Sequence, residues 1–277
     1  MITDISFTCS IDDLKNIEFP KYEKFTLKVI HEEVEYDFLL HLTNSNKVIL
    51  FGAAGYDTKK HVPPIFHRNT WMKDFDQNTI CYNDPTLKPG IGLGWGMGKD
   101  DNWYMEDLSK IIKVITVMIG IKNEDMLFVG YSAGAYQSFI LSTFLKGSRV
   151  FSINSQIELK KFTYGSSLRK ENFRKALKNS FSCYEDLGEE ETINKYKERT
   201  NLLNLFDEYE YFPKTYYLVN ISYKPDVTNH LYDLINHLGE KDYYEDDSLN
   251  IMFYSSKKLG HDPPPKKTIM KFLNQII

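Results

Sequence analysis

A chain of 277 residues, 42% of them hydrophobic, is long enough to bury one large core, and a second domain is possible but not required. The formal net charge of −4 argues against a general nucleic-acid-binding protein, which usually carries a basic excess. Three scattered cysteines, Cys9, Cys81 and Cys183, form no C-x-x-C pair, which fits a reducing compartment and no metal site.

No segment of the sequence predicts export or membrane insertion. The N-terminal residues lack the basic start and the apolar block of a signal peptide. The longest apolar stretch, at 111–121, contains Lys113 and is too short to cross a bilayer. We therefore expect a cytoplasmic protein that has no integral membrane segment.

Predicted strands and helices alternate along the chain. The opening strands, at 25–30 and 36–40, are expected to pair in antiparallel fashion. The elements that follow are strands at 48–51 and 79–82, a helix at 105–119, a strand at 126–129, a helix after Ser132, strands at 150–154 and 216–221, a helix at 230–238, a strand at 249–254 and a terminal helix opened by Pro265. This alternation predicts an α/β fold with a mostly parallel, doubly wound sheet. We expect one domain over 1–277, in which the polar segment 157–213 is a helical insertion that could cap the site.

A serine flanked by glycines lies between the predicted strand at 126–129 and the helix that follows it. The sequence Gly130-Tyr131-Ser132-Ala133-Gly134 fits a nucleophile elbow, a tight turn that presents the serine hydroxyl. The glycines are needed there because the turn leaves no room for side chains. The alternative is a turn of small residues that serves packing alone.

An acid and a histidine follow two later predicted strands. Reactive groups in open α/β sheets gather at the carboxyl ends of the strands, which would bring Asp226 and His261 to Ser132. Histidine suits the role of general base, and a carboxylate orients its ring and stabilises the imidazolium. The alternatives are a turn-forming Asp226 after Pro225 and an ordinary surface-loop His261. We read Asp262 as a cap of the terminal helix and His230 as half-exposed.

An oxyanion hole requires two backbone N–H groups beside the serine. The amide of Ala133, directly after the nucleophile, is one candidate, and Ala53 is the other, with Gly52 or Ala54 as substitutes. The alternative for the loop 52–55 is a dinucleotide-binding turn, but the G-x-G-x-x-G spacing is missing.

With these residues in place, the chain resembles the α/β-hydrolase superfamily over 47–277. It departs from the usual hydrolase pattern at Phe51, where a histidine often precedes the oxyanion glycine. The segments 94–104 and 151–156, together with the elbow, look like hydrolase-like proteins of bacterial capsule and surface-polysaccharide clusters. Some relatives of that kind are similar to capsular polysaccharide O-acetyltransferases, which implies the same triad with acetyl-CoA as acyl donor.

Five further residues are candidates for contact with substrate. Gln156, at a strand's carboxyl end, could bind a sugar or simply form a turn. Trp95 and Trp103 could form a stacking wall for sugar or serve only packing. Gly52 and Tyr131 adjoin the proposed oxyanion loop and nucleophile.

The resemblance and the site together favour acyl transfer through an acyl-Ser132 intermediate. We expect an O-acetyltransferase that acts on hydroxyls of a capsular or surface polysaccharide. A carboxylesterase or deacetylase that acts on small acyl esters is the first alternative. A non-catalytic component of surface-glycan or secretion machinery is the second. The expected partner is a carbohydrate or a small acyl ester, and a homo-oligomer is possible.

Overall fold

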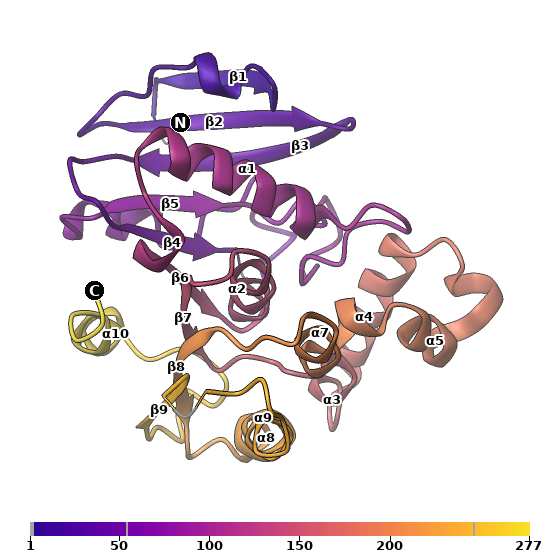
Figure 1. The fold of residues 1–277 in the computed structure, drawn as a ribbon. Helices are drawn as coiled ribbons and strands as arrows, with labels where there is room; N and C mark the ends of the chain where they lie inside the picture. The colour runs from indigo at the N-terminus through magenta and orange to yellow at the C-terminus, as the bar shows by residue number, and fades with distance from the viewer. Residues whose placement is uncertain (1–2, 54, 246) are drawn as a thin grey trace.

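A computed structural model describes residues 3–53, 55–245 and 247–277. Within these residues, nine strands form one sheet in the order β1-β2-β3-β5-β4-β6-β7-β8-β9 (Figure 1). The strands are β1 (Ser6–Ser10), β2 (Lys24–His31), β3 (Val34–His41), β4 (Val48–Gly52), β5 (Asn78–Tyr82), β6 (Met126–Tyr131), β7 (Arg149–Ile153), β8 (Lys214–Asn220) and β9 (Leu249–Tyr254). The helices are α1 (Tyr104–Met118), α2 (Ala133–Phe144), α3 (Leu159–Phe162), α4 (Ser167–Ser180), α5 (Tyr184–Lys195), α6 (Lys197–Thr200), α7 (Leu202–Tyr209), α8 (Lys224–Asp226), α9 (Tyr232–Leu238) and α10 (Lys266–Leu273).

The predicted sheet is confirmed. Strands β5, β4, β6, β7, β8 and β9 run parallel to one another, and β3 joins them in antiparallel pairing with β5. The expected antiparallel pair is β2 with β3. The sequence prediction missed β1, which pairs in parallel with β2 at the sheet edge. Among its five residues only Phe7 and Cys9 are apolar, and they alternate with polar residues. So short an alternation is a weak signal for a strand.

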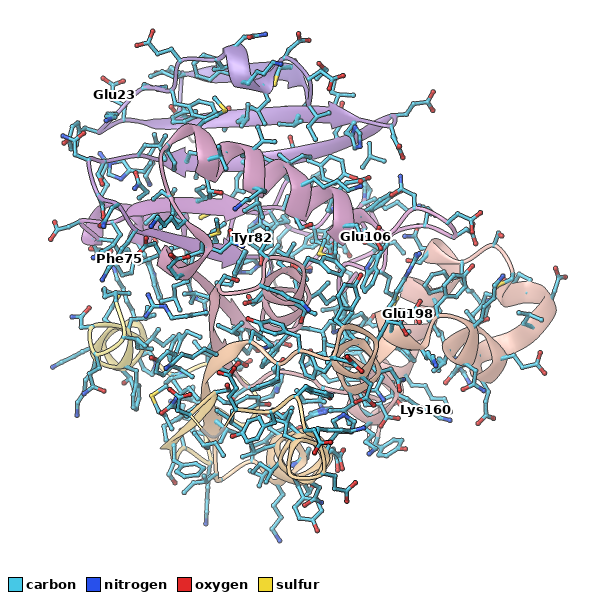
Figure 2. All side chains as sticks on the ribbon, viewed as in Figure 1. Glu23, Phe75, Tyr82, Glu106, Lys160 and Glu198 are labelled. Carbon is cyan, nitrogen blue, oxygen red and sulfur yellow. The ribbon has the colours of Figure 1, made fainter. Side chains whose placement is uncertain are left out.

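The central strands are apolar throughout because both faces of the sheet are covered. In β6, Met126 and Phe128 pack in the core beneath α1 and α2, whereas Leu127 and Val129 pack in a second core that includes Ile269 of α10. Figure 1 shows α10 on one side of the sheet and α1, α2 and α7 on the other. Such two-sided burial is typical of parallel sheets. Tyr82 lies within the packed interior (Figure 2).

The insertion between β7 and β8 consists of helices α3 to α7. Helix α7 packs against α2 through Phe206 and Phe139, whose ring centroids are 5.8 Å apart. Helices α4 and α5 extend past the sheet (Figure 1). The insertion thus packs against α2 through α7, while α4 and α5 project outward.

The helix predicted at 230–238 begins earlier than expected. It starts at α8, continues through the π-helical turn η4 (Val227–Leu231) and ends with α9. Asp226 therefore lies at a helix start rather than in a free loop. His230 is buried, not half-exposed as predicted, because the π-helical turn directs it into the interior.

Candidate active site

Ser132 occupies a strained turn between β6 and α2. Its backbone has φ of 52° and ψ of −121°, a conformation that residues other than glycine rarely adopt. A Cβ atom at Gly130 would collide with the backbone of Gly134 and Ala135. A Cβ at Gly134 would lie 2.9 Å from the carbonyl oxygen of Gly52. The glycines on both sides of the serine are therefore required by the close approach of α2 to β4 and β6.

The strain at Ser132 predicts a stability difference between two inactive variants. We expect Ser132→Gly to have a free energy of unfolding about 1 kcal/mol higher than that of Ser132→Ala, because relief of the positive φ outweighs glycine's entropy in the unfolded chain. Urea unfolding of both variants measures the difference. Both lose the same hydroxyl, so equal stabilities would contradict a strained elbow.

The structure brings Ser132, His261 and Asp226 together at the carboxyl ends of β6, β9 and β8. The Oγ atom of Ser132 is 2.9 Å from Nε2 of His261. The other ring nitrogen, Nδ1, is 2.9 Å from both carboxylate oxygens of Asp226. With the ring proton on Nδ1, Nε2 is free to accept the serine proton. This arrangement can activate a hydroxyl for attack on an acyl group.

Burial controls the charges around the histidine. It raises the pKa of Asp226, although the hydrogen bond from His261 and the charge of Arg169 oppose that rise. The neighbouring His230 has its pKa lowered to about 3, mainly by burial and partly by the charge of His261. Its Nδ1 accepts a hydrogen bond of 3.3 Å from the amide of Ile157. His230 is therefore neutral at physiological pH and does not add a cation beside His261.

Two buried asparagines anchor the loop that carries His261. At the end of β7, Nδ2 of Asn154 donates to the carbonyl oxygen of His261 at 2.7 Å and to the hydroxyl of Tyr254 at 2.8 Å. At the end of β8, Nδ2 of Asn220 donates to the carbonyl of Gly260 at 2.7 Å. The sequence prediction missed both anchors. Their signal was a polar amide that directly ends a buried strand.

Loss of the Asn154 anchor should impair catalysis without removing any reacting group. We expect Asn154→Ala to lower kcat by about 10-fold or more, because small misplacements of a catalytic base are costly. The melting temperature should also fall, since buried partners lose their hydrogen bonds. Asn154 has φ of 45°, so Asn154→Gly is the matched variant that keeps the backbone unstrained. Steady-state kinetics of both variants test this, and wild-type kcat in both would contradict an anchoring role.

The proposed oxyanion donors lie on adjacent backbone segments. The amide of Ala133 is in the first turn of α2, where backbone N–H groups have no partner within the helix. Ala53 follows β4, and its carbonyl oxygen would lie 3.2 Å from a Cβ at Gly134. Ala54, the alternative donor, lies outside the described residues. Gly52 is buried, and a Cβ atom there would lie 2.7 Å from the Tyr82 hydroxyl. Its contact with substrate stays a prediction.

The tryptophans do not form the predicted sugar-stacking wall. Trp95 is completely buried between Phe162 and Phe173. Trp103 is also buried, and it packs on Phe144 at the far end of α2 from Ser132. Aromatic rings next to the glycine-rich segment 94–98 therefore serve packing, the alternative considered from sequence.

Two other residues that the sequence predicts to contact substrate lie beside Ser132. Gln156 is completely buried, and its amide nitrogen is 3.1 Å from Ser132 Oγ, so it faces Ser132 rather than an open sugar site. The ring centroid of Tyr131 lies 5.6 Å from that of His261, and its hydroxyl donates to Asp262 at 3.4 Å. The prediction that Asp262 caps the terminal helix is wrong, because the N-cap position of α10 is Pro265 and no side chain caps it.

A cavity of about 650 Å³ opens over Ser132. It is lined by the loop after β4, by the segment 90–93 and by α3 and α4 of the insertion. The lining side chains include Tyr56, Lys59, Leu93, Tyr131, Ser132, Phe162, Leu168, Asn172 and Lys175. A larger cavity of about 720 Å³, lined by 15–19 and 42–45 among others, is not lined by Ser132, Asp226 or His261. Within the described residues, no helix is long and apolar enough to cross a membrane.

Comparisons with known proteins give evidence on the fold. No family model matches the sequence, and no curated protein matches it. A capsule O-acetyltransferase of Neisseria meningitidis serogroup A, in complex with caged gadolinium, has a TM-score of 0.64 at 15% identity, over 89% of this chain and 95% of that one. A histidine-to-alanine mutant of that enzyme in complex with CoA has a TM-score of 0.63 at 12% identity, over 95% and 99%.

A hydrolase structure extends the same likeness. An S-formylglutathione hydrolase from Agrobacterium tumefaciens has a TM-score of 0.56 at 9% identity, over 94% of this chain and 95% of that one. With the sheet order and the elbow, these likenesses show that the chain has the α/β-hydrolase fold. Within that fold, it is similar to the structures of a capsule O-acetyltransferase.

Proposed function

We propose that the protein transfers acyl groups through a covalent acyl-Ser132 intermediate. The observation that carries this proposal is the unbroken chain of hydrogen bonds from Ser132 Oγ through His261 to buried Asp226, on a strained turn that borders a cavity. Serine is a weak nucleophile at neutral pH, so an adjacent oriented base is what such chemistry requires. If the turn at 130–134 served packing alone, it would not need a histidine beside the Ser132 hydroxyl.

The residues have definite roles in the proposed reaction. Ser132 Oγ attacks the acyl carbon while its proton moves to Nε2 of His261, and Asp226 stabilises the imidazolium through Nδ1. The negative charge on the former carbonyl oxygen is stabilised by the backbone N–H groups of Ala133 and Ala53. One such donor contributes about 3 kcal/mol to transition-state stability. His261 then returns the proton to the leaving group.

The acyl acceptor that we favour is a hydroxyl of a bacterial capsular or surface polysaccharide, with acetyl-CoA as donor. The likeness to the capsule O-acetyltransferase structures, one of them in complex with CoA, supports this choice. The cavity of about 650 Å³ that Ser132 lines offers a place beside the nucleophile for parts of both substrates. Lys59 and Lys175 line it and could meet anionic groups of either substrate.

Transfer and hydrolysis can be separated with labelled acetyl-CoA. Purified protein should become acetylated on Ser132, and addition of an acceptor polysaccharide should move the label to the polymer. Absence of labelling by acetyl-CoA, together with rapid hydrolysis of short-chain aryl esters, would instead assign an esterase or deacetylase. The likeness to the S-formylglutathione hydrolase structure is the observation that supports an esterase or deacetylase as the second candidate function.

A further inference from the structure

The side chain of Gln156 lies against the two atoms that would exchange the proton. Its Nε2 is 3.1 Å from Ser132 Oγ and 3.3 Å from Nε2 of His261. The side chain is completely buried at the carboxyl end of β7, so water does not satisfy its amide. A buried amide in direct contact with the proposed nucleophile and base can affect the proton transfer between them.

Trp95 fixes which end of the amide faces the serine. The indole Nε1–H donates a hydrogen bond of 3.2 Å to Oε1 of Gln156. An indole nitrogen can only donate, so a flipped amide would place two donors against each other. Trp95 is itself held by Phe162 and Phe173 and by its neighbour Gly96, whose amide donates to buried Asp84 at 2.8 Å. The NH₂ group of Gln156 therefore faces Ser132 and His261.

We propose that Gln156 is a further catalytic residue that stabilises negative charge on the serine oxygen itself. The proposal rests on the acyl-serine chemistry above. In this role Gln156 acts on Oγ of Ser132, whereas the oxyanion hole acts on the carbonyl oxygen of the acyl group. A hydrogen bond from a fixed, buried donor to a charged oxygen is stronger than one between neutral groups.

Both half-reactions use this donor. In acylation, the Oγ–H bond breaks, the proton moves to His261, the bond from Oγ to the acyl carbon forms, and the leaving group departs with that proton. In deacylation, water or a sugar hydroxyl gives its proton to His261 and attacks, and Oγ leaves with the electron pair and regains a proton. Oγ carries partial negative charge at both stages, so Gln156 should accelerate both.

The contact with His261 adds an effect on protonation. Neutral Nε2 can accept from the Gln156 amide, whereas protonated Nε2 becomes a donor and opposes it. When Nε2 takes up the serine proton, the Gln156 amide therefore donates to Ser132 Oγ instead. The titratable and charged groups around His261 are Asp226, His230, Arg169, Tyr131, Tyr223 and Asp262.

Gln156→Met tests the effect on rate, with p-nitrophenyl acetate as substrate. Methionine has a similar length but no donor, so the burst rate of acylation and the rate of deacylation should both fall about 100-fold. The matched control is Ser152→Ala, a buried change on β7 at a hydroxyl that has no hydrogen-bond partner within the described residues. The control should keep wild-type rates. Unchanged rates in Gln156→Met would overturn the proposal.

Gln156→Glu tests the effect on protonation and retains an acceptor for Trp95. A carboxylate near the ring favours the imidazolium, so the acid limb of the kcat/KM profile should move up by about one pH unit, in addition to the loss of rate. A role in packing alone would leave that limb in place, and an unmoved limb would overturn the proposal. If wild-type protein acylates Ser132 while both variants behave normally, only this inference fails. If wild-type protein never acylates, the proposed function fails first.

Discussion

Replacement of Ser132 by alanine is expected to lower kcat/KM by about 10⁴-fold or more and to eliminate the acyl-enzyme. Oγ of Ser132 is the atom that His261 contacts at 2.9 Å, and alanine leaves no nucleophile in the turn. Residual turnover would come from binding and the oxyanion donors alone. Steady-state kinetics with an aryl ester and with acetyl-CoA measure the loss.

The fold of this variant should survive, because alanine has nearly the size of serine at a buried position. Its circular dichroism spectrum should therefore match that of the wild type. The same substitution in the source organism tests the non-catalytic alternative, because an unchanged surface-glycan phenotype would favour an assembly role. Wild-type kcat/KM in purified Ser132→Ala would place the chemistry elsewhere.

Asp226→Asn should lower kcat by about 10³- to 10⁴-fold, because an amide can favour the wrong ring tautomer of His261. Both carboxylate oxygens of Asp226 lie 2.9 Å from Nδ1 of His261. Asparagine has nearly the same shape, so the position of the His261 ring should be nearly unchanged in the variant. Single-turnover kinetics should show a slow acylation step with little change in substrate binding. An activity within about tenfold of wild type would argue that another group orients the histidine.

Asp226→Asn should lose activity but gain folding stability near neutral pH. Burial raises the pKa of Asp226 in the folded protein, so ionisation of this group favours the unfolded chain. Its contribution to the free energy of unfolding is fully present below the unfolded pKa, about 4, and is lost as pH rises through the raised folded value. Relative to wild type, Asp226→Asn should therefore gain stability as pH increases from about 4 toward neutrality. Urea unfolding at several pH values measures this trend, and a relative loss with rising pH would contradict it.

The positions of Ser132, Asp226 and His261 could be anticipated because strand order brings distant segments to one sheet edge. Each residue follows an apolar strand, and parallel strands place their carboxyl ends together. That rule depends only on the pattern of elements, which the sequence shows clearly. The catalytic roles of the three residues stay predictions.

The direction of individual side chains could not be predicted in the same way. Gln156 was placed at the correct strand end, but whether it faced a sugar or the nucleophile depended on a hydrogen bond from Trp95, which is 61 positions away. Trp103 is not available for stacking because Phe144 and Arg199 pack against its ring. The π-helical turn that buries His230 has no recognised signal in the local sequence. Tertiary packing decides each of these cases.

The central claim is tested most directly by rapid acid quench of wild-type protein mixed with acetyl-CoA, followed by peptide mass analysis. We predict one acetyl group on the peptide that contains Ser132, formed at least as fast as turnover and absent from Ser132→Ala and His261→Ala. An acetyl group on another residue, or turnover with acetyl-CoA that proceeds without any label on Ser132, would contradict the account.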